Sequence, residues 1–199
     1  WQAGDVVVRR PGVQALLQRR GEARVLSDEF DALQAEAWNP AGRARIAKEE
    51  DESFVLLPPT GASIERRLPE AVDAGRVDLT LRDDGAVRAG RRWGATLTFR
   101  GPEGPAELRV LLGWEEESLA VETPAGPALA VQRLVRTDDW RRLTVRFEAD
   151  RTEVAVDGNA LAHGRAMPGP LESIKIAAEG EPVDDGEDEP PGGAIGSIQ

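Results

Sequence analysis

The sequence predicts an all-β chain folded as an antiparallel β-sandwich, and three observations support this fold class. Short alternations of apolar and polar residues recur at regular spacing, as in half-buried strands. Turn residues such as Pro-Gly and Asp-Gly separate them. The composition, 40% hydrophobic and 31% charged residues over 199 positions, is that of a folded chain large enough for one sandwich core.

The clearest strands lie in residues 140–157. Leu143, Val145 and Phe147 alternate with polar residues, and a second alternation carrying Val154 and Val156 follows a polar break. Asp157-Gly158-Asn159 then supplies residues that tolerate positive φ. We therefore expect two antiparallel strands and a tight hairpin reversal into residues 160–162.

These residues, with Trp140 opening the first strand, resemble the W-x-x-L-x-V-x-F … V-x-V-D-G-x-x-L pattern of laminin-G-like, concanavalin A-like jelly-roll domains. The resemblance implies a jelly roll over residues 21–199 and an extracytoplasmic location, periplasmic or at the cell surface. It carries no catalytic residue over to this chain.

The remaining elements are assigned in chain order. Residues 1–20 are expected to form a lead-in or connector segment, with a short helix that has Pro11 in its first turn and ends at Gly21. Strands then follow, separated by turns at residues 58–61, 101–105 and 124–127. The expected strands cover residues 25–26, 53–57, 62–68, 77–81, 93–99, 108–114, 119–122, 128–135 and 174–176.

The apolar residues that recur at every second position of these strands predict a core. Each member lies on the side of its strand that alternates with polar residues, so all of them should be buried. The predicted core residues are Leu97, Phe99, Val110, Leu112, Val145, Phe147, Val154 and Val156.

Charge and hydropathy limit the partners. The net charge of −11 would repel a nucleic acid and an anionic membrane surface, so neither is an expected partner of this fragment. No stretch approaches the roughly 20 apolar residues of a membrane span. Because the chain begins at Trp1 and an apolar alternation is only starting at Gln199, both ends are interpreted as cuts from a larger protein.

No catalytic residues are predicted. His163 is the only histidine, and no G-x-S-x-G element supplies a nucleophile beside it. Jelly-roll glucanases carry E-x-D-x-E on one strand, which places carboxylates on one face, and this sequence lacks that motif. Glu148-Ala149-Asp150 at a strand end and the run Glu115-Glu116-Glu117 come nearest to it.

Two weaker candidate sites concern ligands. Trp38 is the expected ligand-binding residue for carbohydrate stacking, since the other tryptophans within the strands lie in phase with the core. Asp184, Asp185 and Glu187 offer oxygen ligands for calcium in the acidic stretch of residues 179–193. A solvated acidic linker is the favoured interpretation of that stretch, and no cofactor is expected.

The sequence thus predicts a non-catalytic interaction module, not an enzyme, that binds a glycan or another protein. Two alternatives remain open. One is a structural subunit that forms homo-oligomers through sheet faces or edges. The other is a glycan-active hydrolase whose site the sequence does not reveal.

Overall fold

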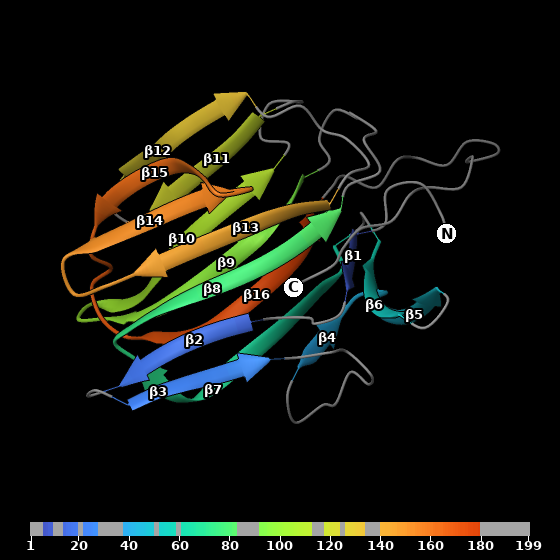
Figure 1. Ribbon diagram of the computed structural model, residues 1–199, viewed down its shortest axis with the longest axis horizontal. Coiled ribbons are helices and arrows are strands. Elements are labelled where there is room, and N and C mark those ends of the chain that lie inside the picture. Colours follow the sequence, from blue (N-terminus) through green and yellow to red (C-terminus); the bar gives the residue numbers. More distant parts are fainter. Residues whose placement is uncertain are drawn as a thin grey trace.

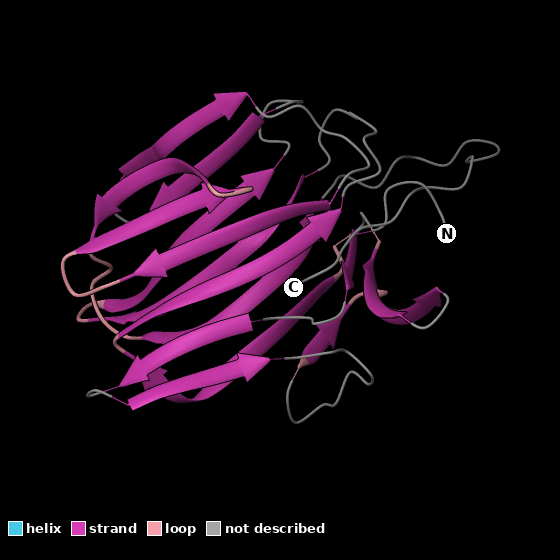
Figure 2. Ribbon diagram, in the orientation of Figure 1, coloured by secondary structure: helices cyan, strands magenta, loops and turns pink. Residues whose placement is uncertain are grey.

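The computed structural model describes residues 6–9, 14–19, 22–27, 38–49, 52–58, 61–82, 92–112, 118–123, 126–133 and 140–179. Every regular element in these ranges is a β-strand, and the strands form two layers (Figures 1 and 2). The described pairs of neighbouring strands are antiparallel, as in the β13–β8 and β9–β10 pairs. The predicted antiparallel jelly-roll sandwich is confirmed.

The first layer, sheet A, has nine strands. Its main path runs β15-β14-β13-β8-β1-β6-β5, and β2 adds to it by pairing with both β8 and β3. The strands of sheet A are β1 (Val6–Arg9), β2 (Gln14–Arg19), β3 (Glu22–Ser27), β5 (Arg45–Glu49), β6 (Glu52–Leu57), β8 (Ala74–Arg82), β13 (Trp140–Phe147), β14 (Arg151–Val156) and β15 (Asn159–Arg165).

The second layer, sheet B, has seven strands in the order β12-β11-β10-β9-β16-β7-β4. Strand β16, late in the sequence, lies between β9 and β7, so the centre of this sheet combines distant segments. The strands of sheet B are β4 (Asn39–Ala41), β7 (Ser63–Val72), β9 (Arg92–Gly101), β10 (Gly104–Leu112), β11 (Ser118–Thr123), β12 (Gly126–Arg133) and β16 (Leu171–Glu179).

The core lies between the two sheets, and the predicted inward-facing positions of the strands are confirmed. The Phe99 ring from sheet B meets the Phe147 ring from sheet A edge to face, with 5.3 Å between the ring centroids. Burial of these alternate positions supplies the main stabilisation of a sandwich. All eight predicted core residues are at most 5% exposed: Leu97, Phe99, Val110, Leu112, Val145, Phe147, Val154 and Val156.

The hairpin at Asp157 and Gly158 is also confirmed. Val156 lies opposite Asn159, so two residues connect β14 and β15. Asp157 and Gly158 have φ values of 51° and 79°, the positive values of a two-residue turn that matches strand twist. The Asp157 carboxylate accepts a 2.8 Å hydrogen bond from the backbone N–H of Arg142, which ties the turn to β13.

The expected N-terminal helix is wrong. Gln14–Arg19, which the helix would have included, is strand β2, and it pairs with β3 and with residues 74–78 of β8. A helix of this length has little intrinsic stability, whereas pairing on both sides satisfies the backbone groups of the strand. The first 20 residues therefore add two strands, β1 and β2, to sheet A.

Candidate functional site

The outer face of sheet B, the side turned away from sheet A, has a floor of small side chains. On β9, Ala95, Leu97 and Phe99 are buried in the core, so Gly94, Thr96 and Thr98 point outward. A Cβ on Gly94 would overlap the carbonyl oxygen of Val110, so only glycine fits there without displacing the backbone. Neighbouring β16 adds its own small outward residues, Ser173 and Ala177.

Two carboxylates lie on one side of this floor, on adjacent strands. Glu107 is an exposed outward residue of β10, opposite Thr98. Glu122 of β11 lies opposite Arg109 of β10, and the guanidinium Nη1 of Arg109 is 3.2 Å from the Glu122 Oε2. Glu107 and Glu122 are therefore diagonal neighbours, a relation that places residues roughly 7–8 Å apart.

The two carboxylates differ in their surroundings. Glu122 is held by Arg109, and both side chains are about a quarter to a third exposed. Glu107 has no ion-pair partner among the described residues and projects into solvent. One carboxylate is thus fixed in orientation and the other is free to approach a bound molecule.

The opposite side of the floor carries charges of both signs. Lys175 of β16 is exposed and lies between Thr96 of β9 and Glu65 of β7. Arg67, whose side chain is 81% exposed, lies 3.9 Å from the Glu65 carboxylate. Charged side chains therefore line both sides of the strip of small residues on β9, with Lys175 standing between Ser173 and Ala177 on β16.

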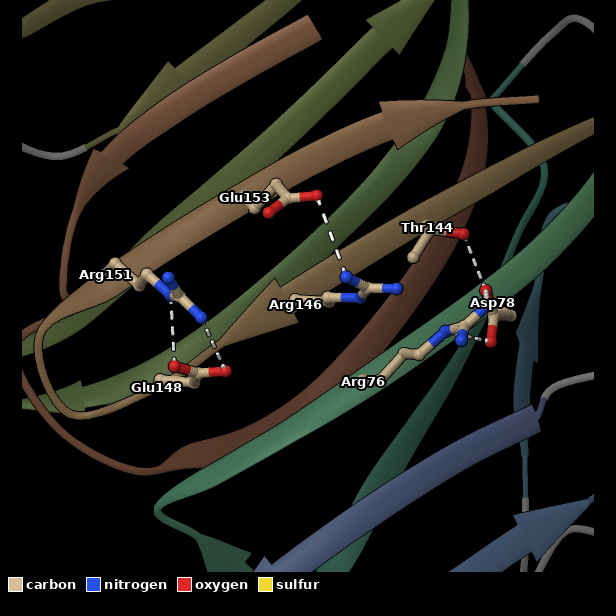
Figure 3. A network of polar contacts seen from close by, with 7 residues as sticks. All are labelled: Arg76, Asp78, Thr144, Arg146, Glu148, Arg151 and Glu153. Atoms are coloured by element: carbon tan, nitrogen blue, oxygen red, sulfur yellow. Dashed lines mark hydrogen bonds and ion pairs between the residues drawn. The ribbon is translucent and has the colours of Figure 1, made fainter. Parts of the chain in front are cut away.

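The outer face of sheet A holds a different polar network (Figure 3). Asp78 of β8 is only 8% exposed in its side chain and accepts a 2.6 Å hydrogen bond from the Thr144 hydroxyl. The Arg76 Nη2 donates to the same carboxylate at 2.9 Å, and the Arg142 Nε lies 3.3 Å from it. This buried carboxylate is compensated by three donors, as burial of a charge requires.

Two weaker ion pairs extend this network toward β14. Arg146 of β13 lies 3.9 Å from the carboxylate of Glu153, directly opposite it. Arg151 donates a 3.0 Å hydrogen bond to Glu148, and this bond and the charge of Glu148 raise the pKa of Arg151. Exposed pairs of this kind stabilise the fold little.

Trp38 is not an exposed platform. Its ring is 0% exposed and belongs to the core, with the Arg66 guanidinium 5.9 Å from the ring centroid. A ring with no exposed surface cannot stack on a sugar, so the structure does not support the ligand-binding role assigned to it. The sequence Trp38-Asn39-Pro40 was interpreted as a loop, so it gave no sign that the tryptophan would pack inward.

Some of the other residues predicted to form sites lie outside the part of the chain that the structure describes. Asp184, Asp185 and Glu187, the candidate calcium ligands, lie outside the described residues, as does the run 115–117. Within the described part of the chain, no group of three or more acidic or histidine side chains is arranged to hold a metal. His163 is exposed on β15 and lies opposite Glu153 of β14.

The sequence alone does not predict the carboxylate pair on sheet B, and the reason is structural. The outward positions of β10 read Glu107, Arg109 and Leu111, so this strand offers one carboxylate and not an E-x-D-x-E series. The second carboxylate, Glu122, comes from β11 and reaches the same face only through the pairing register. Such a pair cannot be recognised from the spacing of carboxylates within a single strand.

The sandwich interior offers no comparable site in the described residues. A cavity between the sheets, lined by apolar residues and Arg141, has a volume of about 10 Å³. That volume suits about one water molecule, not a sugar. The described residues also contain no helix with the length and apolar character needed to cross a membrane.

Comparison with known proteins gives likenesses in structure only. No protein-family model matches the chain, and no curated protein matches its sequence. A glycoside hydrolase family 16 endo-glucanase from Bacteroides ovatus is similar with a TM-score of 0.57 and 8% identity, covering 77% of this chain and 86% of that one. The Bacillus licheniformis β-glucanase has a TM-score of 0.54 and 13% identity, covering 84% and 90%.

A third similar structure comes from a study of endo-acting O-glycanases that human gut bacteria use to initiate mucin breakdown. Its TM-score is 0.59 at 13% identity, and 88% of each chain is covered. At these identities the likenesses establish the concanavalin A-like jelly-roll fold and nothing finer.

The comparisons nevertheless correct the predicted function. The sequence favoured a non-catalytic interaction module and no enzyme, because it lacks the one-strand carboxylate motif. The structures that resemble the chain over most of its length include endo-glucanases and laminarinases, which are hydrolases. These likenesses contradict the prediction of a non-catalytic module and favour the alternative of a glycan-active hydrolase.

Proposed function

We propose that this chain is a glycan-active hydrolase whose substrate lies along the outer face of sheet B. The observation that carries this proposal is the pair of carboxylates on adjacent strands, Glu107 and Glu122, beside a strip of small residues on β9. Glycoside hydrolysis needs two carboxyl groups that flank the scissile bond, about 5–5.5 Å apart in retaining enzymes and about 6.5–9.5 Å in inverting ones. Residues in a diagonal cross-strand pair lie roughly 7–8 Å apart, so the side chains of Glu107 and Glu122 can bring their carboxyl groups to the inverting separation.

The surroundings of the two carboxylates suggest separate roles. Glu122, ion-paired with Arg109, acts as the carboxylate that accepts a proton from the attacking water as the new C1–O bond forms. Glu107, which faces solvent, donates a proton to the glycosidic oxygen as the old C1–O bond breaks. Arg109 is assigned as a positioning residue, because its ion pair fixes the orientation of Glu122.

The floor sets the form of the substrate. An extended strip over Gly94, Thr96 and Thr98, with no bulky side chain, accommodates a polysaccharide segment rather than a small enclosed ligand. The resemblance to a Bacteroides ovatus mixed-linkage glucan hydrolase and to laminarinases makes β-glucans the first substrates to test. A polymeric substrate also favours an extracytoplasmic location.

The test is a hydrolysis assay of the purified chain on mixed-linkage glucan and laminarin, with new reducing ends as the readout. We expect saturable turnover, lowered about 100-fold or more in Glu107→Gln and in Glu122→Gln, the range that general acid–base groups contribute. The matched control is Glu103→Gln, an exposed glutamate in the turn between β9 and β10, which should keep full activity.

Two outcomes would overturn the proposal. One is the absence of hydrolysis of any glycan by the folded wild-type chain. The other is hydrolysis that survives unchanged in both glutamine variants, since it would place the reacting carboxylates elsewhere on the molecule. Arg109→Gln should lower kcat more than it raises KM, as expected for a residue that orients a catalytic group.

A further inference from the structure

The outer face of sheet A has a charge pattern that the proposed hydrolysis does not use. Among the described side chains at outward positions of β8, β13, β14 and β15, five are arginines and two are carboxylates, although the whole chain carries a net charge of −11. A third carboxylate, Glu148, follows β13 directly and binds Arg151. The arginines are Arg76, Arg142, Arg146, Arg151 and Arg165, and the two carboxylates are Asp78 and Glu153.

Two pairs of these arginines lie directly opposite each other on neighbouring strands. Arg146 of β13 faces Arg76 of β8, and Arg151 of β14 faces Arg165 of β15. Residues in such positions have Cβ atoms about 4.5–5.5 Å apart, and like charges placed there destabilise a sheet. The sandwich thus carries two repulsive pairs on one face, and an anion bound between each pair would relieve them.

The carboxylates already present compensate this repulsion only in part. Asp78 is buried and binds the Nε and Nη2 of Arg76 and the Nε of Arg142. Glu148 binds the Nε and Nη2 of Arg151. One Nη group each of Arg76 and Arg151 and both Nη groups of Arg142 remain to bind a ligand. Arg146 has only the 3.9 Å approach to Glu153, and its side chain is 50% exposed. Arg165 is exposed and has no ion-pair partner among the described residues.

We propose that the outer face of sheet A is a binding surface for a polysaccharide that carries oxyanions, either carboxylate or sulfate groups. Guanidinium forks match both groups with paired hydrogen bonds, and the shared Asp78 holds two of the arginines in place before binding. Each opposed arginine pair accepts one oxyanion. The site lies on the other sheet from Glu107 and Glu122, so it is a second glycan site.

The spacing of the two pairs favours a polysaccharide over a nucleic acid. Strand separations of about 4.8 Å and a rise of about 3.4 Å per residue place the pairs roughly 10–12 Å apart. A nucleic acid carries a phosphate at every nucleotide and requires many neutralising contacts, whereas this face offers only two arginine pairs. A polysaccharide with oxyanions on only some of its sugars needs few contacts and can match two separate pairs.

The test is affinity electrophoresis and calorimetry at 0.15 M salt with three polymers that share one backbone: dextran, carboxymethyl-dextran and dextran sulfate. We expect the wild-type chain to bind one or both charged polymers and not dextran. The double variant Arg146→Gln/Arg165→Gln should bind about tenfold or more weakly, since it removes one arginine from each pair. A melting curve of this variant checks that it is folded.

Two control variants distinguish binding at this site from nonspecific attraction by exposed charge and from binding at the proposed active site. Arg67→Gln removes an exposed arginine from the opposite sheet and should leave affinity unchanged. Glu107→Gln should also bind normally, so a failure of the hydrolysis proposal leaves this one standing, and the reverse holds. The proposal is overturned if neither charged polymer binds, if Arg67→Gln loses as much affinity as the double variant, or if a DNA oligonucleotide binds equally well.

Discussion

Two buried threonines of sheet A differ in what their hydroxyl groups contact. The Thr144 hydroxyl donates a 2.6 Å hydrogen bond to the buried Asp78 carboxylate. The Thr152 side chain is 2% exposed and faces the core opposite Phe147, and its Oγ1 has no partner among the described residues. A buried hydroxyl without a partner costs free energy of folding, whereas one bound to a carboxylate stabilises the fold.

The same substitution should therefore act in opposite directions at these two positions. Thr152→Val removes the unpaired hydroxyl and should stabilise the fold by about 1 kcal/mol. Thr144→Val leaves the Asp78 carboxylate short of a donor and should destabilise it by about 1–3 kcal/mol. Thermal melts measure this, because about 1 kcal/mol shifts the melting temperature by roughly 2–4 °C for a chain of this size. A lower melting temperature for Thr152→Val would show that its hydroxyl is satisfied.

At the scale of elements, the conformation of the β14–β15 turn predicts how substitutions of Gly158 affect stability. Gly158 has a φ of 79° with no atom near the position of a Cβ, so strain and not crowding would limit a substitution. Gly158→Val should destabilise the chain by about 1–2 kcal/mol, while Gly158→Asn, which tolerates this conformation, should cost little. Equal melting temperatures for the two variants would mean that the turn is not of this type.

The elements also show what the sequence can and cannot predict. The alternation of apolar and polar residues correctly predicted that Val145, Phe147 and Val154 are buried. This prediction is possible because successive side chains of a strand point to opposite faces, which neighbouring residues in the sequence reveal by themselves. Gln14–Arg19 was expected as a helix because pairing with β8 is not local and its apolar pattern is short. The candidate site was missed for the same reason, since only the β10–β11 register brings Glu107 near Glu122.

For the whole molecule, the two outer faces of the sandwich have different charge patterns. Sheet A presents opposed arginines around a buried carboxylate, whereas sheet B presents a carboxylate pair beside a neutral floor. A glycan-active chain can use both faces, one for reaction and one for attachment to a charged polymer. The net charge of −11 repels any polyanion over long distances at low salt, so binding at sheet A depends on the local arginine pairs.

The acidic stretch at residues 179–193 contributes to this charge and bears on calcium. We propose that it acts as a solvated linker, since its glycines and prolines make a poor rigid cage for the ion. Millimolar calcium should then change the melting temperature no more than magnesium does. A rise of several degrees with calcium alone, abolished by Asp185→Asn, would instead establish Asp184, Asp185 and Glu187 as a metal site.

The most direct test of the central claim is a crystal structure of the Glu107→Gln variant with a bound mixed-linkage gluco-oligosaccharide. We predict sugar residues along the outer face of sheet B, with the scissile bond over β10 between Glu107 and Glu122 and the neighbouring sugars over Thr96 and Thr98 of β9. A glycosidic oxygen should lie within hydrogen-bonding distance of residue 107. An oligosaccharide bound elsewhere on the sandwich, with Glu107 and Glu122 facing only solvent, would contradict the account.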